Sequence, residues 1–356
     1  MAAPFDAITI DGTELRGEAI LAHAQDLHER TGVDWTRSFL GLLEELVDGD
    51  RPISARTSGT TGDPKTIGIP RNDLVASAEL TTATFGLKAN DRALLCLPCD
   101  FIAGKMMVVR AMVLGLNLHL ADPRGGLLER LDVNDRFRFA AMVPQQLLKA
   151  MQEDPERVER QFHTILLGGG PVSEAMIAQL RGLRTAVYQS YGSTETVTHV
   201  AFRRLNGADR SDHYTALGAV SFTTDARDRL VISSPHLSTK EHITNDLVEL
   251  IDATHFRWLG RFDNVILSGG KKVFPEQLES RSAAVLPYPH YFIATPDPVL
   301  GQAVSLVIES DRSEPEVTAE AMSALRSVLD KHELPRMLRV VRSFARTSSG
   351  KIIRKA

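Results

Sequence analysis

The order of apolar and polar positions predicts alternating strands and helices over about the first 200 residues. Residues 19–48 have apolar positions at helical spacing, and DLVASAELTTATFGL predicts a second helix ending at Gly86. Short apolar runs such as ALLCLP, LNLHLA, FAAMVP and HTILL indicate buried strands, with helices expected between them, one of them begun by Ser173. This alternation favours a mostly parallel sheet that binds ligands at the carboxyl ends of its strands.

The pattern changes twice in the later part of the chain. After about Gly218, LVISSP, TNDLVEL and FRWLGR predict short strands in a small antiparallel or barrel-like part. After Asp263, strands and two helices alternate in a compact α+β module of about ninety residues, long enough to fold as a domain. We therefore expect an α/β protein with an N-terminal domain over residues 1–262 and a C-terminal domain over 263–356.

Composition and charge exclude several classes of function. The chain has 356 residues, of which 43% are hydrophobic and 24% charged. Its net charge of -4 does not indicate binding to nucleic acid or to an anionic membrane. The first residues, MAAPFDAITIDG, do not resemble a secretory signal. The apolar stretch Met106–Leu120 is interrupted by Arg110 and Asn117 and is too short to span a bilayer. We expect a cytoplasmic enzyme without a nucleic-acid partner or membrane insertion.

Cys96 and Cys99 are the two cysteines of the chain and are spaced as CxxC. A disulfide scaffold is excluded, and a zinc site would need two more ligands at metal spacing. A redox pair stays an alternative. However, CLPC lies at the end of the apolar run ALLCLP, where cysteine usually behaves as a small hydrophobic residue, so we expect both cysteines in the core.

Two segments contain what a nucleotide triphosphate site needs. TSGTTGDPK, from Thr57, combines small residues and hydroxyl groups, and its amides can form an anion-binding loop. Pro64 separates the glycines from Lys65, which excludes a Walker A loop, and a flexible polar loop would also explain this segment alone. In QSYGSTET, an aromatic ring, a hydroxyl group and the Glu195 carboxylate can serve a base, a phosphate and magnesium respectively.

Three further features become specific only in combination. LLGGGP places three glycines after a strand, which lets a planar group approach the backbone, and Asp246 in TNDL can accept two hydrogen bonds from ribose hydroxyl groups. Lys351 lies in TSSGKIIRKA near the end of the chain. A turn glycine or a surface carboxylate explains each feature alone, but their order over most of the chain points to one nucleotide site.

Together these segments resemble the adenylate-forming superfamily, which includes acyl-CoA synthetases, adenylation domains and luciferases. The resemblance runs from about Thr57 to Lys355. TSGTTGDPK is similar to the phosphate loop of the family, YGSTE to its adenine and magnesium segment, and GGGP to the loop on the other face of adenine. It implies a two-step synthesis of a thioester through an acyl-adenylate, with a mobile C-terminal domain.

The resemblance also implies roles for single residues. Catalysis is assigned to Lys351, Thr194 and Glu195, with Glu195 as the Mg²⁺ ligand, and the hinge to Asp263. CoA is expected at Gly269, Gly270 and Lys271. The residues expected to bind ATP are Thr57, Ser58, Gly59, Thr60, Thr61, Gly62, Lys65, Gly168, Gly169, Gly170, Ser190, Tyr191, Gly192, Thr194, Asp246, Arg261 and Lys351.

A narrower resemblance appears in LLCLPCDFIAGKMMVVRA, STETVTHVAFRRLNG and WLGRFDNVILSGGKKVFPEQLE, which look like the short o-succinylbenzoate–CoA ligases of menaquinone synthesis. It implies a carboxylic acid, ATP and CoA as partners, with Lys105, His199 and Gly104 at the acyl group. Lys105 can instead extend from a helix end to solvent, and His199 can be a hydrogen-bonded core imidazole.

One departure from the family and several alternatives remain. Only about fifty residues precede the phosphate loop, where most members have a longer region, so the walls of the acyl pocket are the least predictable part. The alternatives are a ligase for another acid, an adenylation enzyme that loads a carrier protein, and a non-catalytic nucleotide sensor. Glu195 and Lys351 argue against the sensor. Homo-oligomerisation is left open.

Overall fold

The computed structural model describes residues 4–49, 52–56, 66–347 and 352–354. The chain forms two compact units, which we describe separately. The first unit comprises Met1–Pro171, Leu180–Ser221 and Ser233–His242, and the second comprises Val172–Gln179, Phe222–Ile232 and Ile243–Ala356. Part of the chain before residue 263 thus clusters with the C-terminal residues. The domain boundary and hinge at Asp263 stay predictions.

The first unit contains most of the helices and strands expected before residue 218. Its helices are α1 (Glu18–Thr31), α2 (Asp34–Val47), α3 (Arg71–Phe85), α4 (Ile102–Leu114), α5 (Pro144–Glu153), α6 (Pro155–Gln161) and the 3-10 turn η1 (Leu128–Arg130). Its strands are β1 (Ala7–Ile10), β2 (Thr13–Arg16), β3 (Ile53–Arg56), β4 (Thr66–Ile69), β5 (Arg92–Leu95), β6 (Asn117–Leu120), β7 (Phe137–Met142), β8 (Phe162–Leu167), β9 (Ala186–Gly192), β10 (His199–Arg204) and β11 (Tyr214–Ala216).

The sheet of the first unit is parallel in its centre and antiparallel at both edges. Its strands follow the order β11-β10-β9-β8-β7-β5-β6-β1-β2. The five strand pairs from β9 to β1 are parallel, whereas β1 with β2, β9 with β10, and β10 with β11 are antiparallel. The α/β fold predicted from the alternation of strands and helices is therefore confirmed.

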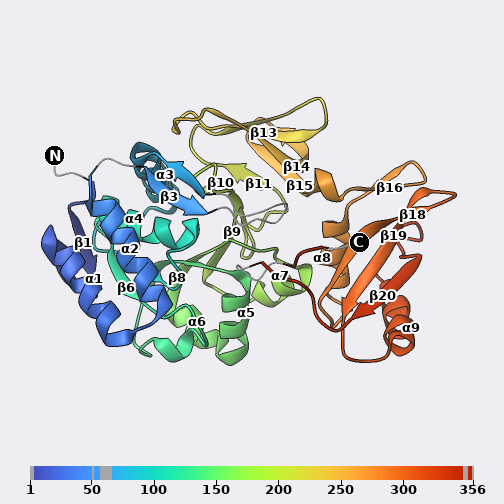
Figure 1. The fold of residues 1–356 in the computed structure, drawn as a ribbon, viewed down its shortest axis with the longest axis horizontal. Helices are drawn as coiled ribbons and strands as arrows, with labels where there is room; N and C mark the ends of the chain where they lie inside the picture. The colour runs from blue at the N-terminus through green and yellow to red at the C-terminus, as the bar shows by residue number, and fades with distance from the viewer. Residues whose placement is uncertain (1–3, 50–51, 57–65, 348–351, 355–356) are drawn as a thin grey trace. The chain divides into compact units, whose positions relative to one another are not determined.

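Helix α4 is the most deeply buried helix of the first unit. It packs against α3 and against β5, β1, β6 and β7, while α1 and α2 lie side by side (Figure 1). All residues from Gly104 to Met112 are buried. Burial on every side explains why the sequence of α4 is apolar around most of its circumference.

Both cysteines lie in this core, as the apolar sequence around them predicts. Cys96 and Cys99 are free thiols with exposures of 0% and 2%. Burial raises the pKa of each thiol to about 12, and the nearby charge of Lys105 only partly opposes this rise at Cys99. A thiol with this pKa is almost entirely protonated at neutral pH, so the pair lacks the thiolate that redox exchange requires.

The second unit combines a short run of antiparallel strands with an α+β module. Its elements are α7 (Glu174–Leu180), β12 (Ser221–Thr224), β13 (Arg229–Ser233), β14 (Glu241–Asp252), β15 (His255–Arg261), η2 (Phe262–Asn264), β16 (Ile266–Ser268), β17 (Lys271–Val273), α8 (Pro275–Ser282), β18 (His290–Asp297), β19 (Gly301–Glu309), α9 (Glu314–Leu325) and β20 (Met337–Val341). Strands of the module follow the order β17-β16-β19-β18, and β20 pairs with β19 in parallel. Ser173 begins α7 as predicted, because its Oγ accepts a hydrogen bond from the Met176 amide.

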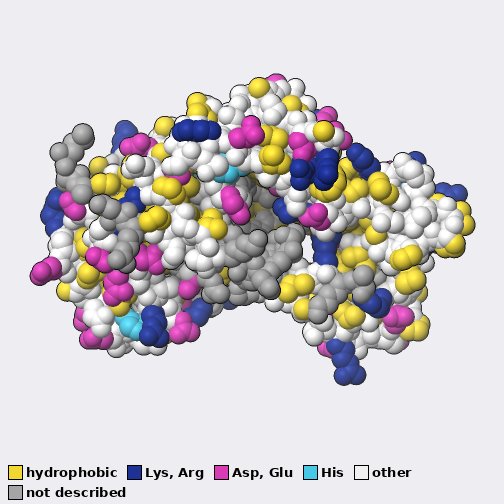
Figure 2. All heavy atoms as spheres, turned by 45° about the horizontal axis from the view of Figure 1, so that its top comes forward, with side chains coloured by type: hydrophobic (Ala, Val, Ile, Leu, Met, Phe, Trp, Pro, Cys, Tyr) yellow, Lys and Arg dark blue, Asp and Glu magenta, His cyan; other side chains and the backbone are white. Residues whose placement is uncertain are grey.

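The surface carries charges of both signs. Acidic and basic side chains are interspersed on the face shown in Figure 2. Among the helices that the structure describes, we find none that is both long and apolar enough to cross a bilayer.

Gly104 has a packing role that the sequence did not indicate. It lies in the first turn of α4, where a Cβ atom would lie 2.2 Å from the carbonyl oxygen of Pro98. That distance is far inside van der Waals contact, so the backbone of α4 and the segment before it can approach this closely only at a glycine. Contact between Gly104 and the acyl group of the substrate stays a prediction.

Gly104→Ala should therefore destabilise the first unit by about 1–3 kcal/mol, because the new methyl group overpacks a closed backbone contact. Gly41→Ala is the matched control: Gly41 lies in α2, and a Cβ there meets nothing within 4 Å. This control should stabilise the protein by up to about 1 kcal/mol through helix propensity. Thermal unfolding measures both. Equal effects of the two substitutions would contradict the packing role.

Candidate active site

A tight loop between β9 and β10 carries two of the predicted catalytic residues, Thr194 and Glu195. A Cβ atom on Gly192 would lie 1.8 Å from the carbonyl oxygen of Thr198, so the two ends of the loop touch through their backbones. Val197 has a φ of 66°, an unfavourable conformation for a β-branched residue. Strain of this kind is found where the surrounding structure holds a functional loop in one shape.

Thr196 holds this loop together from inside. Its side chain is 2% exposed, and its Oγ1 accepts a hydrogen bond from the Ser193 amide at 2.9 Å. The same hydroxyl group lies 2.9 Å from the carbonyl oxygen of Thr198 and 3.2 Å from that of Ser193, both of which can accept its proton. One buried hydroxyl group thus ties both ends of the segment that presents Thr194 and Glu195. Sequence reasoning missed this residue.

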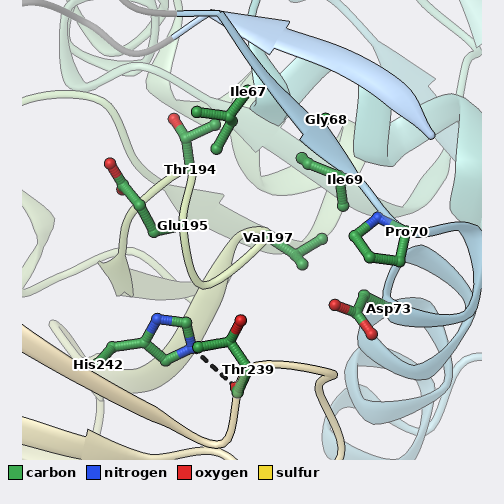
Figure 3. Close-up of a pocket in the computed structure, with 10 residues that line it drawn as sticks. All are labelled: Ile67, Gly68, Ile69, Pro70, Asp73, Thr194, Glu195, Val197, Thr239 and His242. Carbon is green, nitrogen blue, oxygen red and sulfur yellow. Dashed lines mark hydrogen bonds between the residues drawn. The ribbon is translucent and has the colours of Figure 1, made fainter.

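Thr194 and Glu195 line a cavity of about 370 Å³ within the first unit. Figure 3 shows them on one side of the cavity and Asp73 of α3 on the other. The Asp73 Oδ1 accepts hydrogen bonds from the amide and hydroxyl groups of Ser238 at 2.8 and 2.7 Å, which fixes its carboxylate in place. The complete lining is Ile67, Gly68, Ile69, Pro70, Asp73, Thr194, Glu195, Val197, Thr239 and His242.

The donor set around Glu195 suits magnesium better than a metal enclosed by protein ligands. Glu195 is exposed at the cavity, and no cluster of three or more acidic, histidine or cysteine residues able to hold a metal occurs in the described part of the chain. Mg²⁺ commonly takes one or two protein carboxylates and completes its shell with substrate phosphate oxygens and water. The residues present therefore fit a magnesium ion that arrives with a phosphate ligand.

The glycine-rich loop after β8 lies beside the start of this segment. Strands β8 and β9 are parallel neighbours, with Leu167 opposite Gln189. A Cβ on Gly168 would lie 3.0 Å from the Ser190 Oγ, which donates a hydrogen bond to the carbonyl oxygen of Leu167. Gly169 has a φ of 75°, which favours glycine. The structure therefore brings the predicted GGGP and QSYGSTET segments together at the carboxyl ends of two strands.

The second unit contains the predicted ribose-binding pair. Asp246 of β14 and Arg261 of β15 are opposite each other in an antiparallel pair, and the Arg261 Nη1 lies 3.4 Å from the Asp246 Oδ1. Asp263 follows in η2, where its Oδ2 accepts a hydrogen bond from the Asn245 side chain at 2.9 Å. Asp246 and Arg261 are fifteen residues apart in sequence, and strand pairing explains why the predicted pair meets.

Of the predicted CoA residues, Gly269 and Gly270 form the turn between β16 and β17, and Lys271 begins β17. Gly269 and Gly270 have φ values of 56° and 80°, which only glycine adopts easily. Gly269 and Lys271 also line a cavity of about 610 Å³, which includes further basic side chains at Lys331 and Arg336. Sequence reasoning missed the latter two, because they are sixty or more residues from Lys271 and belong to no motif.

The two basic residues predicted at the acyl group are both buried in the first unit. Lys105 is 7% exposed, so it does not extend to solvent. His199 is 4% exposed, with its Nδ1 3.1 Å from the Thr198 Oγ1 and its Nε2 3.4 Å from the Thr81 Oγ1. Burial, reinforced by the charge of Arg110, holds the pKa of His199 well below its usual range. A neutral imidazole can donate a hydrogen bond to an acid but cannot neutralise it.

Of the remaining residues predicted to bind ATP or to act in catalysis, Tyr191 is described by the structure and eight others are not. Tyr191 lies on β9 with its ring 5.5 Å from that of Tyr214, and whether it also stacks on a base stays a prediction. The following predicted residues lie outside the described part of the chain: Thr57, Ser58, Gly59, Thr60, Thr61, Gly62, Lys65 and Lys351.

Comparison with known proteins identifies the class. A family model for AMP-binding enzymes matches residues 56–227. An acyl-CoA synthetase (AMP-forming)/AMP-acid ligase II-like protein from Dyadobacter fermentans, whose structure is solved, is 38% identical with a TM-score of 0.60; the match covers 90% of this chain and 92% of that one. The chain belongs to the AMP-binding enzymes of the adenylate-forming superfamily, as the sequence motifs predicted.

Two further relatives carry a more specific name. A probable 2-succinylbenzoate–CoA ligase from Mycobacterium tuberculosis is 29% identical over 346 residues, which are 90% of this chain and 87% of that one. The o-succinylbenzoate coenzyme A synthetase from Bacillus subtilis, solved in complex with ATP and magnesium ion, has a TM-score of 0.69 and is 21% identical. The match covers 85% of this chain and 68% of that one, and at this identity it shows the fold alone.

Thr196→Val should lower kcat/KM for ATP by about tenfold to a hundredfold, because the loop loses the buried hydroxyl group that orients Thr194 and Glu195. Thr196→Ser keeps the hydroxyl group and is the matched control. Pyrophosphate release measures the effect, and the Mg²⁺ concentration for half-maximal rate should rise only in the valine variant. A valine variant that is folded and has the wild-type magnesium dependence would exclude the positioning role.

Proposed function

We propose that this protein is an AMP-forming acid–CoA ligase whose acid is o-succinylbenzoate. The observation that carries the proposal is the strained loop that presents Thr194 and Glu195 at a cavity, in a chain that belongs to the AMP-binding enzymes. A hydroxyl group and one exposed carboxylate suit phosphate oxygens and their magnesium ion. They are unsuited to a covalent mechanism, for which the loop offers no activated nucleophile.

The first half-reaction joins the acid to AMP. A carboxylate oxygen of the acid attacks the α-phosphorus of ATP, and the bond from that phosphorus to the pyrophosphate oxygen breaks. Negative charge grows on the phosphate oxygens, so catalysis depends on fixed donors placed around them. We assign Thr194 as a hydroxyl donor, Glu195 as the carboxylate that holds magnesium, and Lys351 as the cation between the attacking carboxylate and the α-phosphate. Magnesium, when bound, supplies further neutralisation of phosphate charge.

The second half-reaction transfers the acyl group to CoA. The CoA thiolate attacks the acyl carbonyl carbon, and AMP leaves as the carbon–oxygen bond breaks. We assign the Gly269–Gly270 turn to the pantetheine arm. The cavity beside it, with Lys271, Lys331 and Arg336, has the charge that suits the phosphate groups of CoA. A rotation at Asp263 between the two half-reactions would let one site perform both steps.

The proposed acid is o-succinylbenzoate. The resemblance of FIAGKMM and TETVTH to the o-succinylbenzoate ligases supports it, as does the name of the Mycobacterium tuberculosis relative. o-Succinylbenzoate has an aromatic carboxylate beside the reacting aliphatic one, so its site needs positive charge or donors next to an apolar wall. A ligase for another carboxylic acid is the first alternative, and an adenylation enzyme that loads a carrier protein is the second.

Pyrophosphate release across a panel of carboxylic acids, with and without CoA, tests the proposal. We expect o-succinylbenzoate to be used at least about a hundredfold better than 3-benzoylpropionate, which lacks the aromatic carboxylate. Formation of the thioester should require CoA. Equal use of both acids would overturn the substrate assignment, and thioester formation on a carrier protein in preference to CoA would favour the second alternative. No pyrophosphate release with any acid would overturn the ligase.

Lys351→Ala should reduce adenylate formation by about a hundredfold to a thousandfold but largely spare thioester formation from supplied acyl-adenylate, because the lysine charge acts only at the α-phosphate. Lys149→Ala, at an exposed position of α5, is the control for loss of one lysine charge. Rapid-quench assays of the two half-reactions provide the measurement. Equal damage to both half-reactions would remove Lys351 from its assigned role.

A further inference from the structure

Arg110 is the largest side chain that is fully buried in the described part of the protein, with an exposure of 1%. It projects from α4, and its Nε donates a hydrogen bond to the Thr81 Oγ1 at 3.1 Å. Its Nη1 lies 3.7 Å from the Met107 sulfur, a weak acceptor, and its Nη2 has no hydrogen-bond partner among the described residues. Two of its three nitrogens are thus poorly satisfied.

No carboxylate compensates for this charge within the described residues. Arg110 makes no ion pair there, and the titratable group beside it is His199, which is itself kept neutral. Burial lowers the pKa of Arg110 to about 9, so the guanidinium group still carries its charge at neutral pH. Lys105, on the same helix, is a second buried cation. Burying a cation without a partner costs several kcal/mol, so stability alone does not account for arginine at this position.

A buried polar stripe on α3 leads from the cavity of the candidate active site to Arg110. Asp73, Ser77 and Thr81 are spaced four residues apart and therefore share one face of the helix; their exposures are 7%, 3% and 0%. Asp73 lines the cavity, and Thr81 contacts Arg110 about 12 Å further along the helix axis. Polar residues on the buried face of a helix are uncommon unless they serve a ligand or a network.

A second polar route reaches Arg110 from the loop that carries Thr194 and Glu195. Val197 of that loop lines the cavity, and the adjoining Thr198 contacts His199, which in turn contacts Thr81. Both routes therefore connect the cavity wall to the same guanidinium group. Its Nη2 is closed off from solvent in this conformation, so a ligand reaches it only after the side chains around it rearrange.

We infer that Arg110 binds a second, non-reacting carboxylate of the acid substrate, with His199 as a neighbouring hydrogen-bond donor and with Thr81 holding the guanidinium group in place. The inference rests on the proposed acid–CoA ligase activity and, among the alternative acids for that activity, favours dicarboxylic acids over monocarboxylic ones. It also divides the task among the basic residues: Arg110 supplies the charge, and the neutral imidazole of His199 supplies a donor. A guanidinium group suits this role because it can hold a carboxylate through two parallel hydrogen bonds.

The test compares kcat/KM for o-succinylbenzoate with that for 3-benzoylpropionate in three variants, by pyrophosphate release. In Arg110→Met, a side chain of similar length without charge, the preference for the diacid should fall by about a hundredfold. Arg110→Lys keeps the charge without the planar fork and should lose about tenfold. Arg130→Met, at an exposed position of η1, is the control and should keep the full preference.

Stability separates this role from a structural one. Arg110→Met removes a buried, poorly satisfied cation, so its thermal unfolding midpoint should equal or exceed that of the wild type. A folded Arg110→Met variant that keeps the preference for the diacid would overturn the inference while leaving the ligase intact. Activity with neither acid in the wild type would instead overturn the proposed function.

A second measurement applies if Arg110→Met fails to fold. o-Succinylbenzoate alone, without nucleotide, should then raise the unfolding midpoint of the wild-type protein more than 3-benzoylpropionate does at equal concentration. Equal shifts with the two acids would show that the extra carboxylate finds no partner, and Arg110 would be a structural residue only.

Discussion

The parallel pairing of β8 with β9 is the constraint on which the nucleotide half of the candidate site depends. Because Leu167 lies opposite Gln189, both strands end at the same edge of the sheet, and the two segments that follow them must share that edge. The Gly168 contact with Ser190 and the Ser190 hydrogen bond to Leu167 are consequences of this register. A shift of one residue would turn every side chain of β9 to the opposite face of the sheet and separate the segments.

The same sheet edge explains why strain and burial concentrate in the loop from Ser193 to Thr198. The chain reverses from β9 into the antiparallel β10 so tightly that Gly192 contacts the backbone of Thr198. The reversal leaves Val197 at an unfavourable φ, and the buried hydroxyl group of Thr196 compensates through hydrogen bonds at both ends of the loop. Rigidity of this origin costs stability locally but fixes two polar side chains before any ligand arrives, which lowers the cost of binding.

Local order and short-range motifs could be predicted from the sequence, whereas contacts made across the fold could not. Gly86 was expected to end a helix, and it does so in the left-handed conformation. Asp246 and Arg261 were expected together, and one strand pair joins them. Arg110 appeared only as an interruption of an apolar stretch, because its meaning depends on Thr81 of another helix. In the sequence, the one sign of a role for Arg110 was its position as an arginine within an apolar stretch.

Two ion pairs hold Arg354, three residues after Lys351, against helix α8. Arg354 lies 2.8 Å from the Glu279 Oε2 and 3.4 Å from the Glu276 Oε1, and it donates a hydrogen bond to the carbonyl oxygen of Phe292. Burial raises the pKa of Glu279 to about 7 even though Arg354 opposes the rise, so this pair carries a desolvation cost. Asn264, next to the predicted hinge residue, contacts the same Glu276. Glu276 on α8 therefore contacts both Arg354, three residues after the predicted catalytic lysine, and Asn264, next to the predicted hinge residue.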